Sequence, residues 1–147
     1  MTDFHVINPE VAGGFGENVD LDAGPHPPVV KHLHYEFDGW MGDDLVTSFP
    51  CYLASSRLKQ ALEASPELSG FSFRTAEISK SEQFEEVSPE AARALPEVWW
   101  LQVDGRPGID DLGLTALADL IVSSRALAIL QRLNLANADI SVFEASE

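Results

Sequence analysis

Two matching stretches decide the fold: Leu53-Ala54-Ser55-Ser56-Arg57 and, 68 positions later, Ile121-Val122-Ser123-Ser124-Arg125. In each stretch an apolar run leads into two serines and an arginine. A serine at such a boundary can accept hydrogen bonds from the free N–H groups in the first turn of a helix. Each stretch therefore predicts a strand that ends where a serine-capped helix begins.

The segments after the two serine pairs share one helical pattern. We expect helices over Ser55–Ser65 and Ser123–Leu133, followed by strands over Phe71–Ile78 and Ala138–Phe143. One face of each helix recurs at i, i+3, i+4 and i+7, the period of an α-helix. The matched positions are Leu58, Ala61, Leu62 and Ser65 in the first copy and Ala126, Ile129, Leu130 and Leu133 in the second. The sequence thus predicts an internal duplication of a strand–helix–strand unit, over about residues 45–79 and 112–144.

The rest of the chain predicts further strands around one core. Apolar and polar residues alternate over Val29–Phe37, as in a half-buried strand, and Val98–Val103 is typical of a buried one. Glycines and prolines gather in residues 11–28, so we expect a loop-rich N-terminal arm over residues 1–28. A chain of 147 residues, 45% of them hydrophobic, has the size of one domain. We therefore expect a single α+β domain over residues 1–147, with a mixed β-sheet and two or three short helices.

Net charge limits the classes of partner. The chain has 24 Asp and Glu against 9 Lys and Arg, a formal net charge of −15. Binding to nucleic acid depends on Lys and Arg that displace counterions from phosphates, and binding to anionic membranes depends on the same residues. We therefore expect neither nucleic acid nor a membrane as the direct partner.

The compartment is predicted from what the chain lacks. The first residues show no basic and apolar signal for secretion, and the most apolar stretch, Leu112–Leu130, is interrupted by Asp119 and Arg125. Cys51 is the only cysteine, which excludes an intrachain disulfide and a cysteine-based zinc site. We expect a cytoplasmic protein in which Cys51 is a buried thiol in a strand.

The best metal candidate is the segment His32-Leu33-His34-Tyr35-Glu36. On a strand, His32, His34 and Glu36 project from one face, and two histidines with one carboxylate form a known ligand set for Zn²⁺ or Fe²⁺. The same alternation also places polar residues outward on any half-buried strand, and the spacing is not that of a helical His-Glu-x-x-His motif. We expect no metal and no cofactor, with these three residues kept as an alternative.

Paired carboxylates occur at Asp43-Asp44, Glu85-Glu86 and Asp110-Asp111. Adjacent residues on a strand point to opposite faces, so these pairs are not acid and base partners as they stand. The serines also lack the Gly-x-Ser-x-Gly setting of a nucleophile. We therefore predict solvated acidic loops and no catalytic residues.

Three segments together resemble a family of small bacterial immunity proteins from polymorphic toxin systems. They are Phe37-Asp38-Gly39-Trp40-Met41-Gly42-Asp43-Asp44-Leu45, Ser55-Ser56-Arg57-Leu58-Lys59-Gln60-Ala61-Leu62 and Ser69-Gly70-Phe71-Ser72-Phe73. Asp110-Asp111-Leu112 and Ile121-Val122-Ser123-Ser124-Arg125 are similar to the second half of that family, so the resemblance covers about Leu33 to Ile140. The resemblance implies a protein that is not an enzyme and that binds and neutralises one cognate toxin domain.

An acidic inhibitor would match the basic cleft of a nuclease toxin and speed the encounter. The sequence leaves two alternatives, a metal-dependent hydrolase using His32, His34 and Glu36 and an acidic regulatory protein that binds another partner. Trp is common among the residues that dominate binding, so Trp40 is the expected apolar anchor. The predicted partner-binding residues are Trp40, Asp43, Asp44, Glu82, Glu85, Glu86, Asp110 and Asp111.

Overall fold

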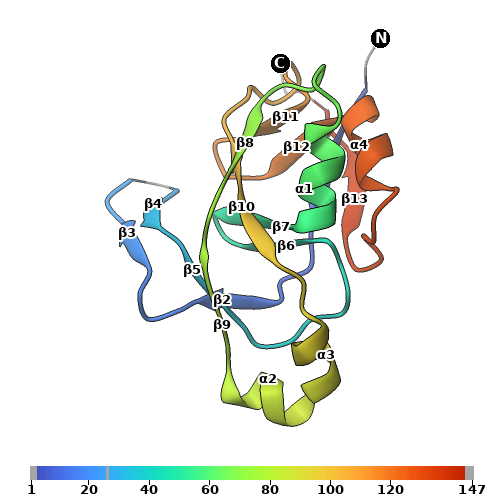
Figure 1. Ribbon diagram of the computed structural model, residues 1–147. Helices are drawn as coiled ribbons and strands as arrows, with labels where there is room; N and C mark the ends of the chain where they lie inside the picture. The colour runs from blue at the N-terminus through green and yellow to red at the C-terminus, as the bar shows by residue number, and fades with distance from the viewer. Residues whose placement is uncertain (1–2, 26, 145–147) are drawn as a thin grey trace.

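Two four-stranded antiparallel sheets with the same connectivity form the centre of the structure, a computed structural model that describes residues 3–25 and 27–144 (Figure 1). The strand order is β6-β7-β10-β8 in the first sheet and β11-β12-β1-β13 in the second. The strands of the first sheet are β6 (Leu45–Ser48), β7 (Cys51–Ser55), β10 (Val98–Val103) and β8 (Phe71–Arg74). Those of the second are β11 (Leu112–Leu114), β12 (Leu120–Ser123), β1 (Phe4–Asn8) and β13 (Asp139–Val142).

A helix follows the second strand of each sheet. Helix α1 (Ser56–Glu63) follows β7, and helix α4 (Ser124–Leu130) follows β12. The two helices pack side by side, as Figure 1 shows. The caps are those that the sequence predicts: Ser55 Oγ accepts from the Leu58 N–H at 3.3 Å, and Ser123 Oγ accepts from the Ala126 N–H at 3.1 Å. The predicted order of strand, serine cap, helix and strand is thus confirmed in both halves.

The halves exchange one strand. Strand β10 precedes β11 in the chain but pairs with β7 and β8 of the first sheet. The N-terminal strand β1 pairs with β12 and β13 of the second sheet. Each half therefore takes its third strand from a segment outside its own strand–helix–strand unit.

The arm predicted to be rich in loops over residues 1–28 contains three strands with loops between them. This segment contains β1, an inner strand with Ile7 fully buried, and also β2 (Gly13–Phe15) and β3 (Asp20–Asp22). Glycine has a packing role here: a Cβ at Gly13 would clash with the Glu36 backbone, and one at Gly16 would clash with the His34 ring. The glycines therefore permit close approach of the chain to its neighbour strand, rather than marking a loop.

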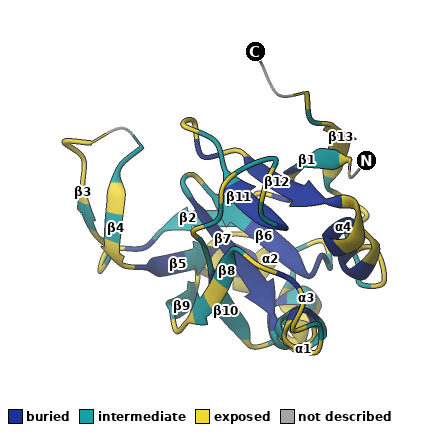
Figure 2. Ribbon diagram, turned by 90° about the horizontal axis from the view of Figure 1, so that it is seen from above, coloured by how far each residue is buried: buried dark blue, intermediate teal, exposed yellow. Residues whose placement is uncertain are grey.

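The remaining strands form two smaller sheets. Strand β5 (His34–Phe37) pairs with β2 antiparallel and with β9 (Glu77–Lys80) parallel. Strand β4 (Val29–His32) pairs with β3 in a ribbon that projects from the body (Figures 1 and 2). The single strands predicted over Val29–Phe37 and Phe71–Ile78 are therefore each divided in two, and four sheets replace the one mixed sheet expected.

Helices α2 (Glu82–Val87) and α3 (Pro89–Ala94) lie together at the end of the molecule opposite β11 (Figure 1). Helix α3 begins at Pro89, a residue that suits the first turn because it has no N–H to leave unpaired. Helix α2 was not predicted, because Phe84 is its only buried residue and its other positions are polar or exposed. With α1 and α4 the described residues contain four helices rather than two or three, and the α+β class is confirmed.

Buried hydrophobic side chains form two clusters. One joins α1 and α4 to the two four-stranded sheets, with Leu62 and Leu130 inside it. The other lies around β5, α2 and α3 and includes Trp100. The strand alternation is confirmed for its apolar set, since Leu33, Tyr35 and Phe37 are all buried in this second cluster. Within the described residues no helix is both long enough and apolar enough to cross a bilayer.

Candidate functional site

The predicted site residues occupy separate places in the fold. Asp43-Asp44 and Asp110-Asp111 lie just before β6 and β11, the first strands of the two repeated sheets. The glutamates lie on α2, outside the repeat. These places differ in burial and in hydrogen bonding, so each group has a different role.

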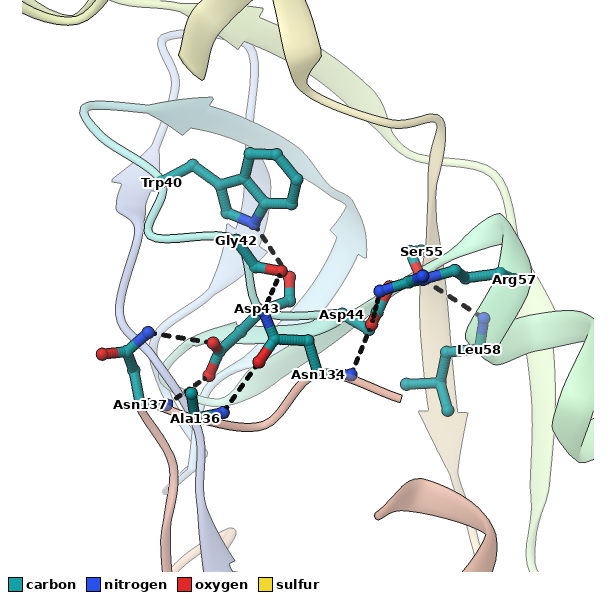
Figure 3. Close-up of polar contacts among 10 residues, drawn as sticks. All are labelled: Trp40, Gly42, Asp43, Asp44, Ser55, Arg57, Leu58, Asn134, Ala136 and Asn137. Atoms are coloured by element: carbon teal, nitrogen blue, oxygen red, sulfur yellow. Dashed lines mark hydrogen bonds and ion pairs between the residues drawn. The ribbon is translucent and has the colours of Figure 1, made fainter. Parts of the chain in front are cut away.

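Asp44 is a buried acceptor of four hydrogen bonds (Figure 3). Its Oδ1 accepts from Ser55 Oγ at 2.6 Å and from Arg57 Nε at 2.7 Å. Its Oδ2 accepts from Arg57 Nη2 at 2.7 Å and from the Asn134 backbone N–H at 2.7 Å. Burial by itself raises the pKa of Asp44, but the hydrogen bonds from Arg57, Ser55 and Asn134 outweigh it and hold the pKa below its ordinary value.

Asp111 repeats this arrangement atom for atom. Its Oδ1 accepts from Ser123 Oγ at 2.6 Å and from Arg125 Nε at 2.7 Å. Its Oδ2 accepts from Arg125 Nη2 at 2.8 Å and from the Ser69 backbone N–H at 3.0 Å. The Arg125 hydrogen bonds, opposed by burial, lower the pKa of Asp111 to about 2.

The second serine of each motif holds the exchanged strand. The Ser56 N–H donates to the Glu97 carbonyl at 2.9 Å, just before β10, and the Ser124 N–H donates to the Asp3 carbonyl at 3.0 Å, just before β1. Their hydroxyls donate to the same two carbonyls, at 3.3 and 3.1 Å. The first serine, the second serine and the arginine therefore each have a structural partner in both copies.

The turn before β6 adds a second buried carboxylate, that of Asp43 (Figure 3). Asp43 accepts from the backbone N–H and from the side-chain amide of Asn137, both at 2.9 Å. Its carbonyl accepts from Trp40 Nε1 at 2.8 Å. Gly42 has a φ of +104°, a conformation that favours glycine, and its carbonyl accepts from the Asn134 side-chain amide at 2.9 Å.

The prediction that these aspartates lie in solvated acidic loops was wrong for three of them. Asp43, Asp44 and Asp111 are buried, and their carboxylates are engaged within the chain. Asp110 is half-buried and accepts from Ser69 Oγ at 3.1 Å and from the Arg106 N–H at 2.7 Å. These aspartates are buried because each pair holds the segment that follows the helix of the other half. Asp43-Asp44 accept from the segment after α4, and Asp110-Asp111 accept from the segment after α1. Little of their carboxylate surface is then left for a partner protein.

The segments that donate to these aspartates could not be identified from the sequence. The residues concerned are Ser69, Asn134 and Asn137, and each donates both through its backbone N–H, which any residue except proline could supply, and through its side chain. The 68-residue offset was the one available signal, since it links the two serine–arginine motifs and so implies a common acceptor. This offset does not indicate which backbone N–H completes each site, that of Asn134 at Asp44 or that of Ser69 at Asp111.

The predicted glutamates remain at the surface. Glu82, Glu85 and Glu86 are exposed on α2, and Val87 beside them is one of the most exposed apolar side chains in the described residues. Trp40 is half-buried against the second core cluster. The accessible part of the predicted surface is therefore α2, with Trp40 only partly available.

The candidate metal ligands have other partners. The His34 Nδ1 accepts from the Asn18 N–H at 3.1 Å, and its Nε2 lies 2.8 Å from Ser79 Oγ. The His32 Nε2 lies 2.9 Å from Glu77 Oε1. His34 is buried rather than outward as predicted, because Gly16 lies against its ring and Asn18 and Ser79 bond to its two nitrogens. In residues 3–25 and 27–144, no three His, Cys, Asp or Glu side chains are grouped so as to hold a metal ion.

Cys51 lies at the start of β7 and is buried, as predicted. Burial raises the pKa of its thiol to about 12, so the reactive thiolate is scarce at neutral pH. This environment is that of a core residue.

Comparison with known proteins does not assign this chain to a family. No protein-family model matches the chain, and no curated protein matches its sequence.

Proposed function

We propose that this protein is an immunity protein, a non-catalytic inhibitor that binds and neutralises a cognate bacterial toxin through an acidic surface. It acts in the cytoplasm of the cell that makes the toxin. The proposal rests on the resemblance of residues 33–140 to that family of immunity proteins and on the way in which acidic side chains are distributed.

The observation that carries the proposal is the acidic face of α2. Glu82, Glu85 and Glu86 follow the i, i+3, i+4 spacing, so they share one face of the helix, and all three are exposed. The first two lie in the first turn, where negative charge favours the helix dipole. Glu86 lies near the carboxyl end, where the dipole disfavours it, so helix stability alone does not explain the cluster.

The buried aspartates are paired with arginines, whereas the glutamates of α2 are not. Asp44 pairs with Arg57 and Asp111 pairs with Arg125, so two of the nine Lys and Arg residues are engaged in ion pairs with buried aspartates. The α2 glutamates have no ion pair within 4.0 Å in the part of the chain that the structure describes. Unpaired surface charge acts over roughly a Debye length and steers a basic partner toward the face.

Binding to a toxin domain encoded beside this gene tests the proposal. The wild-type chain should form a complex and abolish the toxin's activity. In the variant Glu82→Gln/Glu85→Gln/Glu86→Gln, the association rate constant at low salt should fall roughly tenfold, and its salt dependence should flatten.

A matched control removes three other exposed acids, through Glu17→Gln, Asp104→Asn and Asp139→Asn. This control changes the net charge by the same amount as the α2 variant. If the α2 face is the contact, the control should lower the association rate constant less than the α2 variant does. Absence of any complex with the toxin domain would contradict the immunity function. Equal effects of the two triple variants would contradict the assignment of α2 as the contact surface, but not the proposal that the protein is an inhibitor.

A further inference from the structure

Strand β13 forms an open edge of the second four-stranded sheet. It lies at the end of the order β11-β12-β1-β13, and all four of its residues, Asp139–Val142, are exposed. Figure 1 shows β13 at the right of the molecule, with no further strand beside it. Within the described residues, its outer backbone edge is therefore not covered by another strand.

The backbone groups at this edge follow from the hydrogen bonds on its inner side. In an antiparallel pair, successive residues direct their N–H and C=O groups alternately toward the neighbouring strand and away from it. The Phe143 N–H, just after β13, donates to the Phe4 carbonyl of β1 at 2.9 Å, so the odd-numbered residues here face β1. The N–H and C=O groups of Ile140 and Val142 therefore point outward, where no described strand pairs with them.

The side chains at these two positions are apolar. Ile140 is 37% exposed and Val142 is 67% exposed, and residues two positions apart share one face of a strand. Open edges in natural proteins are usually protected by lysine, by proline or by a bulge. Strand β13 contains neither lysine nor proline, and its register with β1 is regular. The edge is therefore suited to the addition of another strand.

The corresponding edge of the first sheet, that of β8, is protected by basic side chains. Phe73 of β8 matches Ile140 of β13, since each lies opposite a core residue of the third strand. Lys59 Nζ lies 5.6 Å from the centre of the Phe73 ring, and Arg74 is the next residue of β8. In the second half, the position 68 residues after Lys59 is Leu127. The lysine beside the first edge is thus replaced by an apolar residue in the second half.

The charges near the β13 edge are negative. One position beyond the Phe4–Phe143 contact, Asp3 and Glu144 follow at the same end of the two strands, and both are exposed. Residues 1–30 and 133–147 contain no Lys or Arg. The β13 edge therefore complements a basic strand, whereas the basic side chains at β8 would repel one.

We propose that an extended basic segment of the partner protein adds to β13 as a fifth strand of the second sheet. Its backbone pairs with the outward N–H and C=O groups of Ile140 and Val142, and its apolar side chains cover these two residues. A Lys or Arg at one end of the segment faces Asp3 and Glu144. The inference deepens the proposed function and rests on it for the identity of the partner, the toxin domain.

Hydrogen exchange of the wild-type chain, free and bound to the toxin domain encoded beside this gene, tests the inference. The amides of Ile140 and Val142 should exchange at least about tenfold more slowly in the complex, because new hydrogen bonds protect them. The Phe73 amide, which points outward at the β8 edge by the same alternation, is the internal control. It should exchange at the same rate in the free and the bound chain.

Two variants at one position separate the backbone from the side chain. Val142→Pro removes an outward N–H without removing a bond to β1, and proline is tolerated at such edge positions. It should raise the dissociation rate constant of the complex roughly tenfold, since one interchain hydrogen bond is lost. Val142→Thr keeps the N–H and the branched shape, so it should change this constant by less than about twofold. Urea unfolding checks that both variants are folded, and the exchange experiment does not depend on either.

The outcomes distinguish the strand addition from the inhibitor function. A complex that inhibits the toxin while the Ile140 and Val142 amides exchange as in the free chain would overturn the inference and leave the proposed function intact. Absence of any complex would overturn the proposed function, and the identity of the added strand with it. Slower exchange of the same amides as the concentration of the chain alone is raised would assign the edge to a second copy, which would also overturn the inference.

Discussion

Asp44 and Asp111 lie 67 positions apart, and their carboxylates accept hydrogen bonds from the same four kinds of donor. In each case Oδ1 takes a serine hydroxyl and an arginine Nε, and Oδ2 takes an arginine Nη2 and a backbone N–H. The backbone N–H comes from the other half of the chain, Asn134 for Asp44 and Ser69 for Asp111. Each half thus completes the buried site of the other, so the two halves form one structural unit.

Replacing the arginines by lysine tests the bidentate geometry. Arg57→Lys and Arg125→Lys should each lower the free energy of unfolding by about 1–2 kcal/mol, because an ammonium cannot reproduce the two parallel bonds. This decrease in unfolding free energy is smaller than for an ion pair in which both side chains are buried, because the side chains of Arg57 and Arg125 are 64% and 58% exposed. Urea unfolding measures the change, and Arg132→Lys, at an exposed position, is the control. Arg125 Nη2 also donates to the Glu67 carbonyl at 3.0 Å, so Arg125→Lys should cost the more of the two. A negligible effect of either substitution would contradict the structural role of the two ion pairs.

Acid should weaken the Asp111 site in a defined pH range. The pKa of Asp111 is lowered from 3.8 to about 2 in the folded chain, so the folded state binds its proton less readily than the unfolded state. The resulting stabilisation is fully present above about pH 4 and is lost as the pH falls toward about 2. Urea unfolding between pH 6 and pH 2 measures it. In Asp111→Asn stability should be lower at pH 6 and should depend less on pH in this interval; an unchanged slope would contradict the assignment.

Leucine truncation tests whether the two helices bury the same face. Leu62 and Leu130 are 0% and 1% exposed and occupy matching positions in α1 and α4. Leu62→Ala and Leu130→Ala should each cost roughly 2–5 kcal/mol of unfolding free energy, the usual range for a core leucine. Leu117→Ala, at an exposed position, should cost no more than about 0.5 kcal/mol. Denaturant unfolding of the three variants measures the difference, and a cost below that limit at Leu130 would contradict its burial.

The repeated unit could be predicted because its signals are local. Serine caps and a helical apolar period are set by residues within one turn of each other, so Ser55 and Ser123 identify both helix starts. Strand β10 was predicted with its observed bounds for the same reason, from the apolar run Val98–Val103.

The exchange of strands could not be predicted, because it depends on contacts between distant segments. Nothing in the composition of Phe4–Asn8 indicates that it pairs with β12 rather than with its neighbours in sequence. Likewise, burial of Asp43, Asp44 and Asp111 follows from donors that lie far along the chain, so their charge alone suggested exposed loops.

In the proposed complex the apolar anchor Trp40 and the acidic face of α2 should act on different rate constants. Trp40 is half-buried beside a surface hollow of about 410 Å³, so in the proposed complex Trp40→Ala should mainly raise the dissociation rate constant. Loss of the α2 glutamates should mainly lower the association rate constant, since long-range charge acts before contact. Stopped-flow association and competition-based dissociation at two salt concentrations measure both constants. Because Trp40→Ala also removes the hydrogen bond to the Asp43 carbonyl, its unfolding free energy must be compared with that of the wild-type chain. A folded Trp40→Ala variant that dissociates at the wild-type rate would exclude Trp40 from the interface, whatever the effect of the glutamates.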